Sequence, residues 1–142
     1  MTVTANSVVT PQTPSEAIVQ FVGTTDGTAT LKTLVAGGTN GTKVFGMFAT
    51  NDGTAHNLSI CLVNAVGTSV INTVSLTANA GKNGTTAPIA CMALANWPGL
   101  PVDGNGNPYF YLTGTADSVQ LKYATAQATT DTIVVMAQVA NF

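Results

Sequence analysis

The residues with the most chemistry in this 142-residue sequence are one histidine, His56, and two cysteines, Cys61 and Cys91. A catalytic serine or cysteine needs a neighbouring base, and His56 is the only imidazole that could supply one. His56 and Cys61 lie five positions apart in an alternating segment, which places their side chains on opposite faces of a strand. No G-x-S-x-G nucleophile elbow occurs. We therefore expect no enzyme.

Metal chemistry is disfavoured as well. Zinc sites commonly use cysteines in C-x-x-C spacing, which this chain lacks. Asp103, Asn105 and Asn107 imitate the start of a calcium loop. However, Pro108 stands where that loop needs glycine, and Gly114 stands where it needs a bidentate glutamate. The segment is predicted to be a tight turn, and we expect neither a metal nor a cofactor.

Charge is scarce along the whole chain. Only 7% of residues are charged, with four lysines, no arginine and a net charge of −2, against roughly 25% in typical soluble proteins. The lysines are scattered, so nucleic acid is disfavoured as a partner. Neutral polar groups are cheaper to desolvate than charges, which favours a surface covered by other proteins in an assembly. A plain neutral surface is the alternative.

No targeting or membrane segment is evident. Residues 1–13 contain neither the basic nor the apolar region of a signal peptide. No stretch reaches the ~20 apolar residues of a membrane span, so no membrane partner is expected. We expect synthesis in a reducing cytoplasm, where Cys61 and Cys91 are free thiols rather than a disulfide.

Residues 1–15 are predicted to be an extended N-terminal arm. Pro11 and Pro14, set among Thr, Ser and Gln, favour extended backbone. Residues 1–9 alternate loosely and could add to the edge of a neighbouring sheet. A frayed terminus is the alternative reading.

Residues 16–142 are predicted to be a single β-sandwich domain. Short alternating segments are separated by turns rich in Gly, Asn and Asp, and no segment sustains a helical period. The predicted strands are residues 17–22, 28–35, 43–50, 56–63, 69–76, 109–113, 118–123 and 132–139, with 87–95 as either a strand or a helical turn. Eight or nine such strands indicate an all-β, antiparallel β-sandwich of jelly-roll type.

Alternation also predicts which side chains face the core. The inward residues are Val70, Val74 and Leu76 in 69–76, Val119, Leu121 and Tyr123 in 118–123, and Ile133, Val135, Ala137 and Val139 in 132–139.

Three aromatic residues gather around a Pro/Gly-rich loop. Tyr109 and Tyr111 share a strand face, and Trp97 begins the loop. An exposed row of these rings could stack on sugars. The alternative is that the rings close the end of the sandwich, and the usual burial of aromatic side chains favours it.

Two segments carry a resemblance. Residues 31–43 read L-K-T-L-V-A-G-G-T-N-G-T-K, and residues 98–109 read P-G-L-P-V-D-G-N-G-N-P-Y. They resemble the patterns L-x-T-L-x-x-A-G-x-N-G-x-K, with Gly37 at the alanine position, and P-G-L-P-x-D-x-x-G-N-P-Y. These patterns are shared by a group of small phage and prophage proteins encoded close to the major capsid gene.

The resemblance implies a virion structural protein, specifically a capsid decoration or cement protein that binds the outer head surface and stabilises capsomer contacts. The implied partners are the major capsid protein and further copies of the chain, as a homotrimer. The implied location is the virion, assembled in the host cytoplasm. A tail, neck or fibre-base protein is the first alternative, and a carbohydrate-binding module is the second. The expected contact residues lie in the arm and in the loops 78–86 and 96–108: Val3, Val8, Pro11, Pro14, Lys82, Asn83, Trp97, Leu100 and Tyr109.

Overall fold

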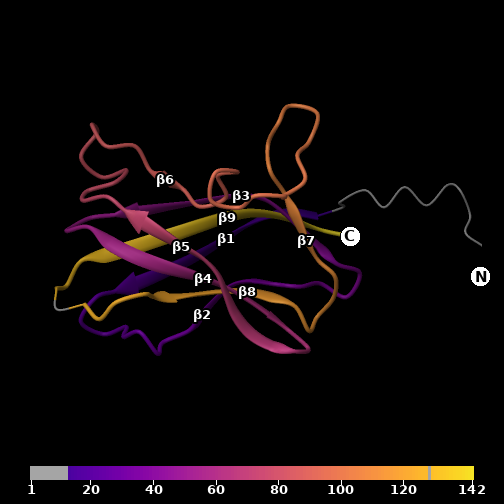
Figure 1. Cartoon of the computed structure of the whole chain (residues 1–142), viewed down its shortest axis with the longest axis horizontal. Coiled ribbons are helices and arrows are strands. Elements are labelled where there is room, and N and C mark those ends of the chain that lie inside the picture. The colour runs from indigo at the N-terminus through magenta and orange to yellow at the C-terminus, as the bar shows by residue number, and fades with distance from the viewer. Residues whose placement is uncertain (1–12, 128) are drawn as a thin grey trace, which may run out of the picture.

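Two antiparallel sheets packed face to face form the protein in the computed structural model, which describes residues 13–127 and 129–142 (Figure 1). The strands in the described residues are β1 (Thr13–Val22), β2 (Lys32–Ala36), β3 (Thr42–Asn51), β4 (His56–Asn64), β5 (Gly67–Leu76), β6 (Ile89–Ala90), β7 (Phe110–Leu112), β8 (Ser118–Tyr123) and β9 (Thr132–Asn141). The predicted all-β antiparallel sandwich is confirmed. Within the described ranges, no helix is long and apolar enough to cross a membrane.

The sheets are built from strands that are distant in the chain. Sheet A has the order β1-β9-β3-β6, with β7 also paired to β3, and sheet B has the order β2-β8-β4-β5. Consecutive strands mostly lie in opposite sheets, the β4–β5 hairpin being one exception. The chain therefore crosses repeatedly from one layer to the other.

The core lies between the two layers and follows the predicted alternation. The inward residues of β8 (Val119, Leu121, Tyr123) and of β9 (Ile133, Val135, Ala137, Val139) are all buried. Each of these strands is central in its sheet, so a neighbouring strand flanks it on both sides and the opposite sheet covers its inner face. The inward assignment of the two strands is confirmed.

The N-terminal boundary differs from the prediction. β1 begins at Thr13, and Pro14 pairs with Ala140 of β9, so residues 13–15 belong to the sandwich rather than to an arm. β1 is an edge strand, where a proline can turn the side that lacks an N–H away from its neighbour.

Three predicted strands are shorter than expected, and one of them, 109–113, forms a strand only over Phe110–Leu112. Strand β2 starts only at Lys32, because Thr30 donates its amide to the Gly27 carbonyl in a turn. In the segment 87–95, only Ile89–Ala90 forms a strand, and turns follow it.

The prediction that Val70 faces the core is wrong. The β4–β5 register passes from the pair Ile60–Asn72 to the pair Cys61–Val70, which leaves Ile71 without a partner. Such a bulge changes the face on which the residues beyond it project. Val70 is consequently 52% exposed, whereas Val74 and Leu76 are buried as predicted.

Candidate assembly surfaces

His56 belongs to a hydrogen-bonded latch at one end of the sandwich. Its Nε2 lies 3.0 Å from Asp131 Oδ2, and the same oxygen accepts bonds of 2.7 Å from the amide and from the hydroxyl of Thr54. The imidazole is buried edge-to-face against Tyr123. This carboxylate joins the β3–β4 turn to the segment before β9. The arrangement fixes two loops and presents no activated nucleophile.

The latch has a pH signature. The Thr54 hydroxyl and then its amide are the main reasons why the pKa of Asp131 falls to about 2. A carboxyl with a depressed folded-state pKa stabilises the protein above its unfolded pKa of ~3.9, and this contribution is lost as pH falls through about 2. Asp131→Asn is therefore expected to lower the melting temperature at pH 7 and to match the wild type near pH 2. Thermal unfolding followed by circular dichroism at pH 7, 4 and 2 checks this, and an equal difference at all three values would contradict it.

The turn predicted at Asp103 is present. Asp103 Oδ1 accepts bonds of 2.9 Å from the amides of Asn105 and Asn107, and Oδ2 accepts one of 3.2 Å from Asn107 Nδ2. These bonds, first those from Asn107, lower the pKa of Asp103. The hydrogen bonds of the Asp103 carboxylate therefore stabilise the turn in which Asp103 itself lies. Across residues 13–127 and 129–142, no group of three or more His, Cys, Asp or Glu side chains could hold a metal.

Both cysteines are free thiols, and both are buried. Burial raises the pKa of Cys91 to about 12. Burial also raises the pKa of Cys61, against a smaller opposing effect of Lys122. Buried thiols that resist ionisation are poor nucleophiles.

The predicted contact residues do not form one cluster. Val3, Val8 and Pro11 lie outside the described residues. Lys82 and Asn83 are exposed on the loop between β5 and β6, whereas Trp97, Leu100 and Tyr109 lie between β6 and β7. Figure 1 shows these two segments at separate places along the same side of the sandwich. Pro14 lies in β1.

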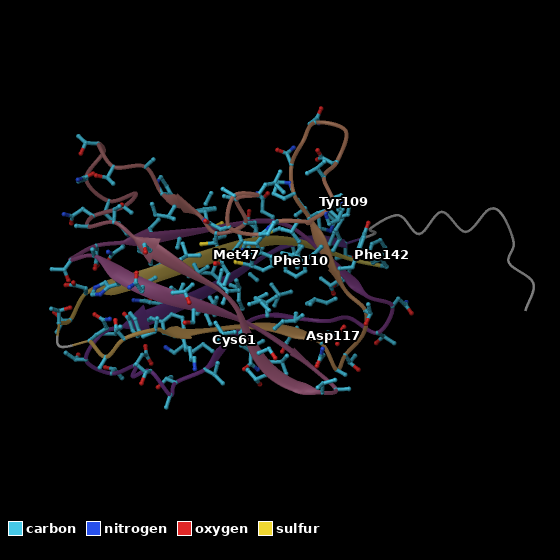
Figure 2. The ribbon with its side chains drawn as sticks, viewed as in Figure 1. Met47, Cys61, Tyr109, Phe110, Asp117 and Phe142 are labelled. Carbon is cyan, nitrogen blue, oxygen red and sulfur yellow. The ribbon has the colours of Figure 1, made fainter. Side chains whose placement is uncertain are left out.

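The predicted aromatic cluster divides into two groups. Trp97 stacks on Phe110, with ring centroids 5.5 Å apart and planes at 22°, and both rings pack against the core. Tyr109 lies edge-to-face with Tyr111 at 5.4 Å, near Phe142 (Figure 2). The indole face is thus occupied by Phe110, and the three predicted rings do not form one stacking platform.

The outer face of sheet A carries a row of apolar side chains that crosses three neighbouring strands. The strand register places Ile18 of β1 beside Met136 of β9, and Met136 beside Phe48 of β3. We call these three residues the apolar row. Ile18 is 57% exposed, and Met136 and Phe48 are half-buried. Val134 and Phe45 extend the apolar surface on the same strands.

The outer face of sheet B is more polar, because most of its side chains are hydroxyls and amides, although Val70 on the edge strand β5 is 52% exposed there. The bonded pairs are Ser75–Asn57 at 2.9 Å, Gln120–Thr33 at 3.3 Å and Ser59–Thr73 at 3.4 Å. A polar outer face is usual for a sheet that meets water. The outer face of sheet A is therefore the more apolar of the two.

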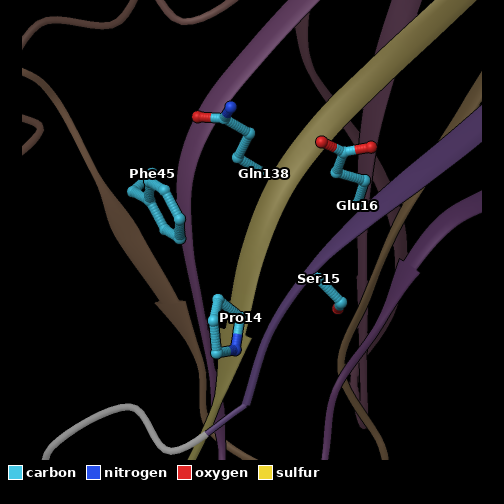
Figure 3. Close-up of a pocket in the computed structure, with 5 residues that line it drawn as sticks. All are labelled: Pro14, Ser15, Glu16, Phe45 and Gln138. Atoms are coloured by element: carbon cyan, nitrogen blue, oxygen red, sulfur yellow. The ribbon is translucent and has the colours of Figure 1, made fainter.

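Two hollows make a groove beside the apolar row. One, of about 560 Å³, is lined by Pro14, Ser15, Glu16, Phe45 and Gln138 (Figure 3). The second, of about 450 Å³, shares Phe45 and Gln138 and continues to the loop before β7. The groove thus runs from the beginning of β1 across β9 and β3.

Comparisons with known proteins identify a similar solved structure but no matching sequence. No protein-family model matches the chain, and no curated protein sequence matches it. Among solved structures, a chain of the cyanophage Pam1 capsid asymmetric unit is similar, with 16% sequence identity and a TM-score of 0.47 over 92% of this chain and 84% of that one.

Proposed function

We propose that this protein is a virion structural protein, specifically a capsid decoration or cement protein that binds the outer head surface and stabilises contacts between capsomers. The observation that carries the proposal is the contrast between the two outer faces: sheet A presents the apolar row across three neighbouring strands, and sheet B presents mainly hydroxyls and amides. Apolar surface of this kind marks protein–protein contact. The resemblance of residues 31–43 and 98–109 to phage structural proteins supports the capsid as the partner.

In this proposal, the outer face of sheet A lies against the capsid and sheet B faces the solvent. Only Glu16 among the five residues lining the first hollow is charged. Few charges therefore lose water on docking, which limits the desolvation penalty. The strand order, in which the chain crosses repeatedly between a five-stranded and a four-stranded layer, supports the jelly-roll type. The resemblance supports a homotrimer.

The N-terminal segment is expected to contribute to binding. Deleting residues 2–12 removes Val3, Val8 and Pro11 but keeps β1, which starts at Thr13 beside the groove. We expect weaker binding to particles and an unchanged melting temperature. Co-sedimentation of wild type and deletion variant, with circular dichroism as the folding control, measures both. Unchanged binding would remove this segment from the contact.

The proposal is tested by binding to purified particles that lack the protein. Heads and tails are separated, mixed with the protein over a concentration range and sedimented. Saturable binding to heads is the expected result. Saturable binding to tails alone would establish the alternative of a tail, neck or fibre-base protein.

A further inference from the structure

The edge of sheet A at β1 is long and regular. β1 pairs with β9 over ten residues without a register shift, and it is the last strand on that side of the sheet. Ile18 and the residues from Thr13 to Glu16 are exposed. An unbroken, exposed edge strand is a template on which another strand can pair.

The side chains around this edge cap only its C-terminal part. Lys32 Nζ donates to the Gln20 carbonyl at 2.8 Å, and the Val22 amide donates to Asp26 Oδ2 at 2.8 Å. These backbone groups therefore point away from β9. Because backbone groups in an antiparallel ladder alternate sides, those of Glu16 and Ile18 point the same way. No residue of the described ranges bonds to them.

Pro14 limits the open edge at its other end. Pro14 lies four residues before Ile18, so its backbone points away from β9 as that of Ile18 does. Because proline has no N–H, it cannot donate a hydrogen bond to a strand that pairs on this side. The backbone groups that remain available are the N–H and C=O groups of Glu16 and Ile18 and the N–H of Gln20, whose carbonyl already accepts from Lys32. A strand that pairs here must match the short segment from Glu16 to Gln20.

We propose that β1 of one copy pairs antiparallel with β1 of a second copy, about a two-fold axis at Ile18. In this register, Ile18 lies opposite Ile18 of the second copy, and Glu16 lies opposite Gln20. On the inner face, Ala17 lies opposite Val19. The contact is between copies of this chain, and it stands independently of the proposed binding to capsids.

Charge favours this register over the two whose axes lie nearer the N-terminus of β1. Glu16 is the only charged side chain on β1, and an axis at Glu16 would place two carboxylates opposite each other. An axis at Ala17 would place Glu16 opposite the apolar Ile18. The axis at Ile18 instead brings each carboxylate to Gln20, whose carbonyl already holds the Lys32 ammonium.

Pairing of this kind extends sheet A across two copies. The apolar row of one copy then continues directly into that of the other, because Ile18 is its outermost residue. The apolar surface doubles in length without exposing a further charge. Where copies also form trimers, the two-fold contact joins one trimer to the next.

Cross-linking tests the register. The variants Ile18→Cys and Gln20→Cys each add one accessible thiol to a chain whose own cysteines are buried. With a short bismaleimide, Ile18→Cys is expected to give covalent dimers. Gln20→Cys is expected to stay monomeric on a denaturing gel, because the two Gln20 positions lie about four strand residues apart, roughly 13 Å. Equal cross-linking of the two variants, or none at Ile18→Cys, would overturn the proposal.

Sedimentation in solution, without particles, tests the contact itself. The full chain is expected to be a concentration-dependent dimer. Ile18→Lys places two ammonium groups opposite each other and is expected to raise the dissociation constant ~10-fold or more. Val66→Lys, at a position that is 96% exposed on the β4–β5 turn, is the matched control and should leave it unchanged. A wild-type chain that stays monomeric, or equal effects of the two lysines, would overturn the proposal, whatever the result of the capsid experiments.

Discussion

Replacing Phe21 with alanine is expected to lower the free energy of unfolding by about 3–5 kcal/mol. Phe21 is fully buried and lies edge-to-face with Tyr123, with ring centroids 5.5 Å apart. Lys32 Nζ lies 4.9 Å from the centroid of the same ring. The ring thus joins β1 of sheet A to β8 and β2 of sheet B. Its removal leaves a cavity between the layers, and equilibrium unfolding in urea measures the loss.

Ile18→Ala is the matched control for this experiment. Ile18 lies on the same strand, but its side chain is 57% exposed on the outer face. Its truncation is expected to change the free energy of unfolding by no more than about 0.5 kcal/mol, as for other surface positions. Comparable losses for Phe21→Ala and Ile18→Ala would contradict the assignment of inner and outer faces to β1.

Replacing Met136 with lysine is expected to weaken binding to heads ~30-fold or more, because loss of a central interface residue costs about 2 kcal/mol. Met136 is the middle residue of the apolar row, between Ile18 and Phe48. An ammonium group at this position must be desolvated when the face is covered. A binding isotherm from co-sedimentation with heads gives the change in affinity.

Gln120→Lys supplies the comparison on the other face. Gln120 lies on β8, a central strand of sheet B, as Met136 lies on a central strand of sheet A. The same new charge is expected to leave binding to heads unchanged, because the outer face of sheet B is not the docking face. A larger loss for Gln120→Lys than for Met136→Lys would reverse the orientation proposed for the protein.

Much of the sandwich could be predicted from local alternation. The strand 118–123 has the predicted bounds, and the inward residues of β9 are as predicted. Both strands bury one face between the layers, and the alternation of apolar residues at every second position indicates this directly. The bulge at Ile71 could not be predicted in this way, because it depends on pairing with β4. Val70 was assigned to the wrong face for that reason.

The apolar row had a partial signal in the sequence. The run Ile133–Ala137 is apolar at every position, which is typical of a strand covered on both faces. Recognising the row also requires knowing that β9 lies between β1 and β3, and that arrangement comes from pairing between distant segments. Trp97 was expected at a contact because of its loop, whereas the folded chain stacks it on Phe110.

Pro14 shows how a local rule can mislead about a boundary. A proline set among polar residues predicted an arm. An edge strand nevertheless accommodates a proline where no neighbouring strand would accept a hydrogen bond from its N–H. The same residue lines the hollow beside Phe45. Pro14 therefore belongs both to the edge of sheet A and to the lining of the groove.

The orientation of the protein on the particle tests the account most directly. Heads that lack the protein are saturated with it, imaged by electron cryomicroscopy and reconstructed to a resolution that separates the two sheets. We expect the outer face of sheet A, with Ile18, Met136 and Phe48, to lie against the capsid and sheet B to face the solvent. Density with sheet B against the capsid, or heads that remain bare while tails are decorated, would contradict it.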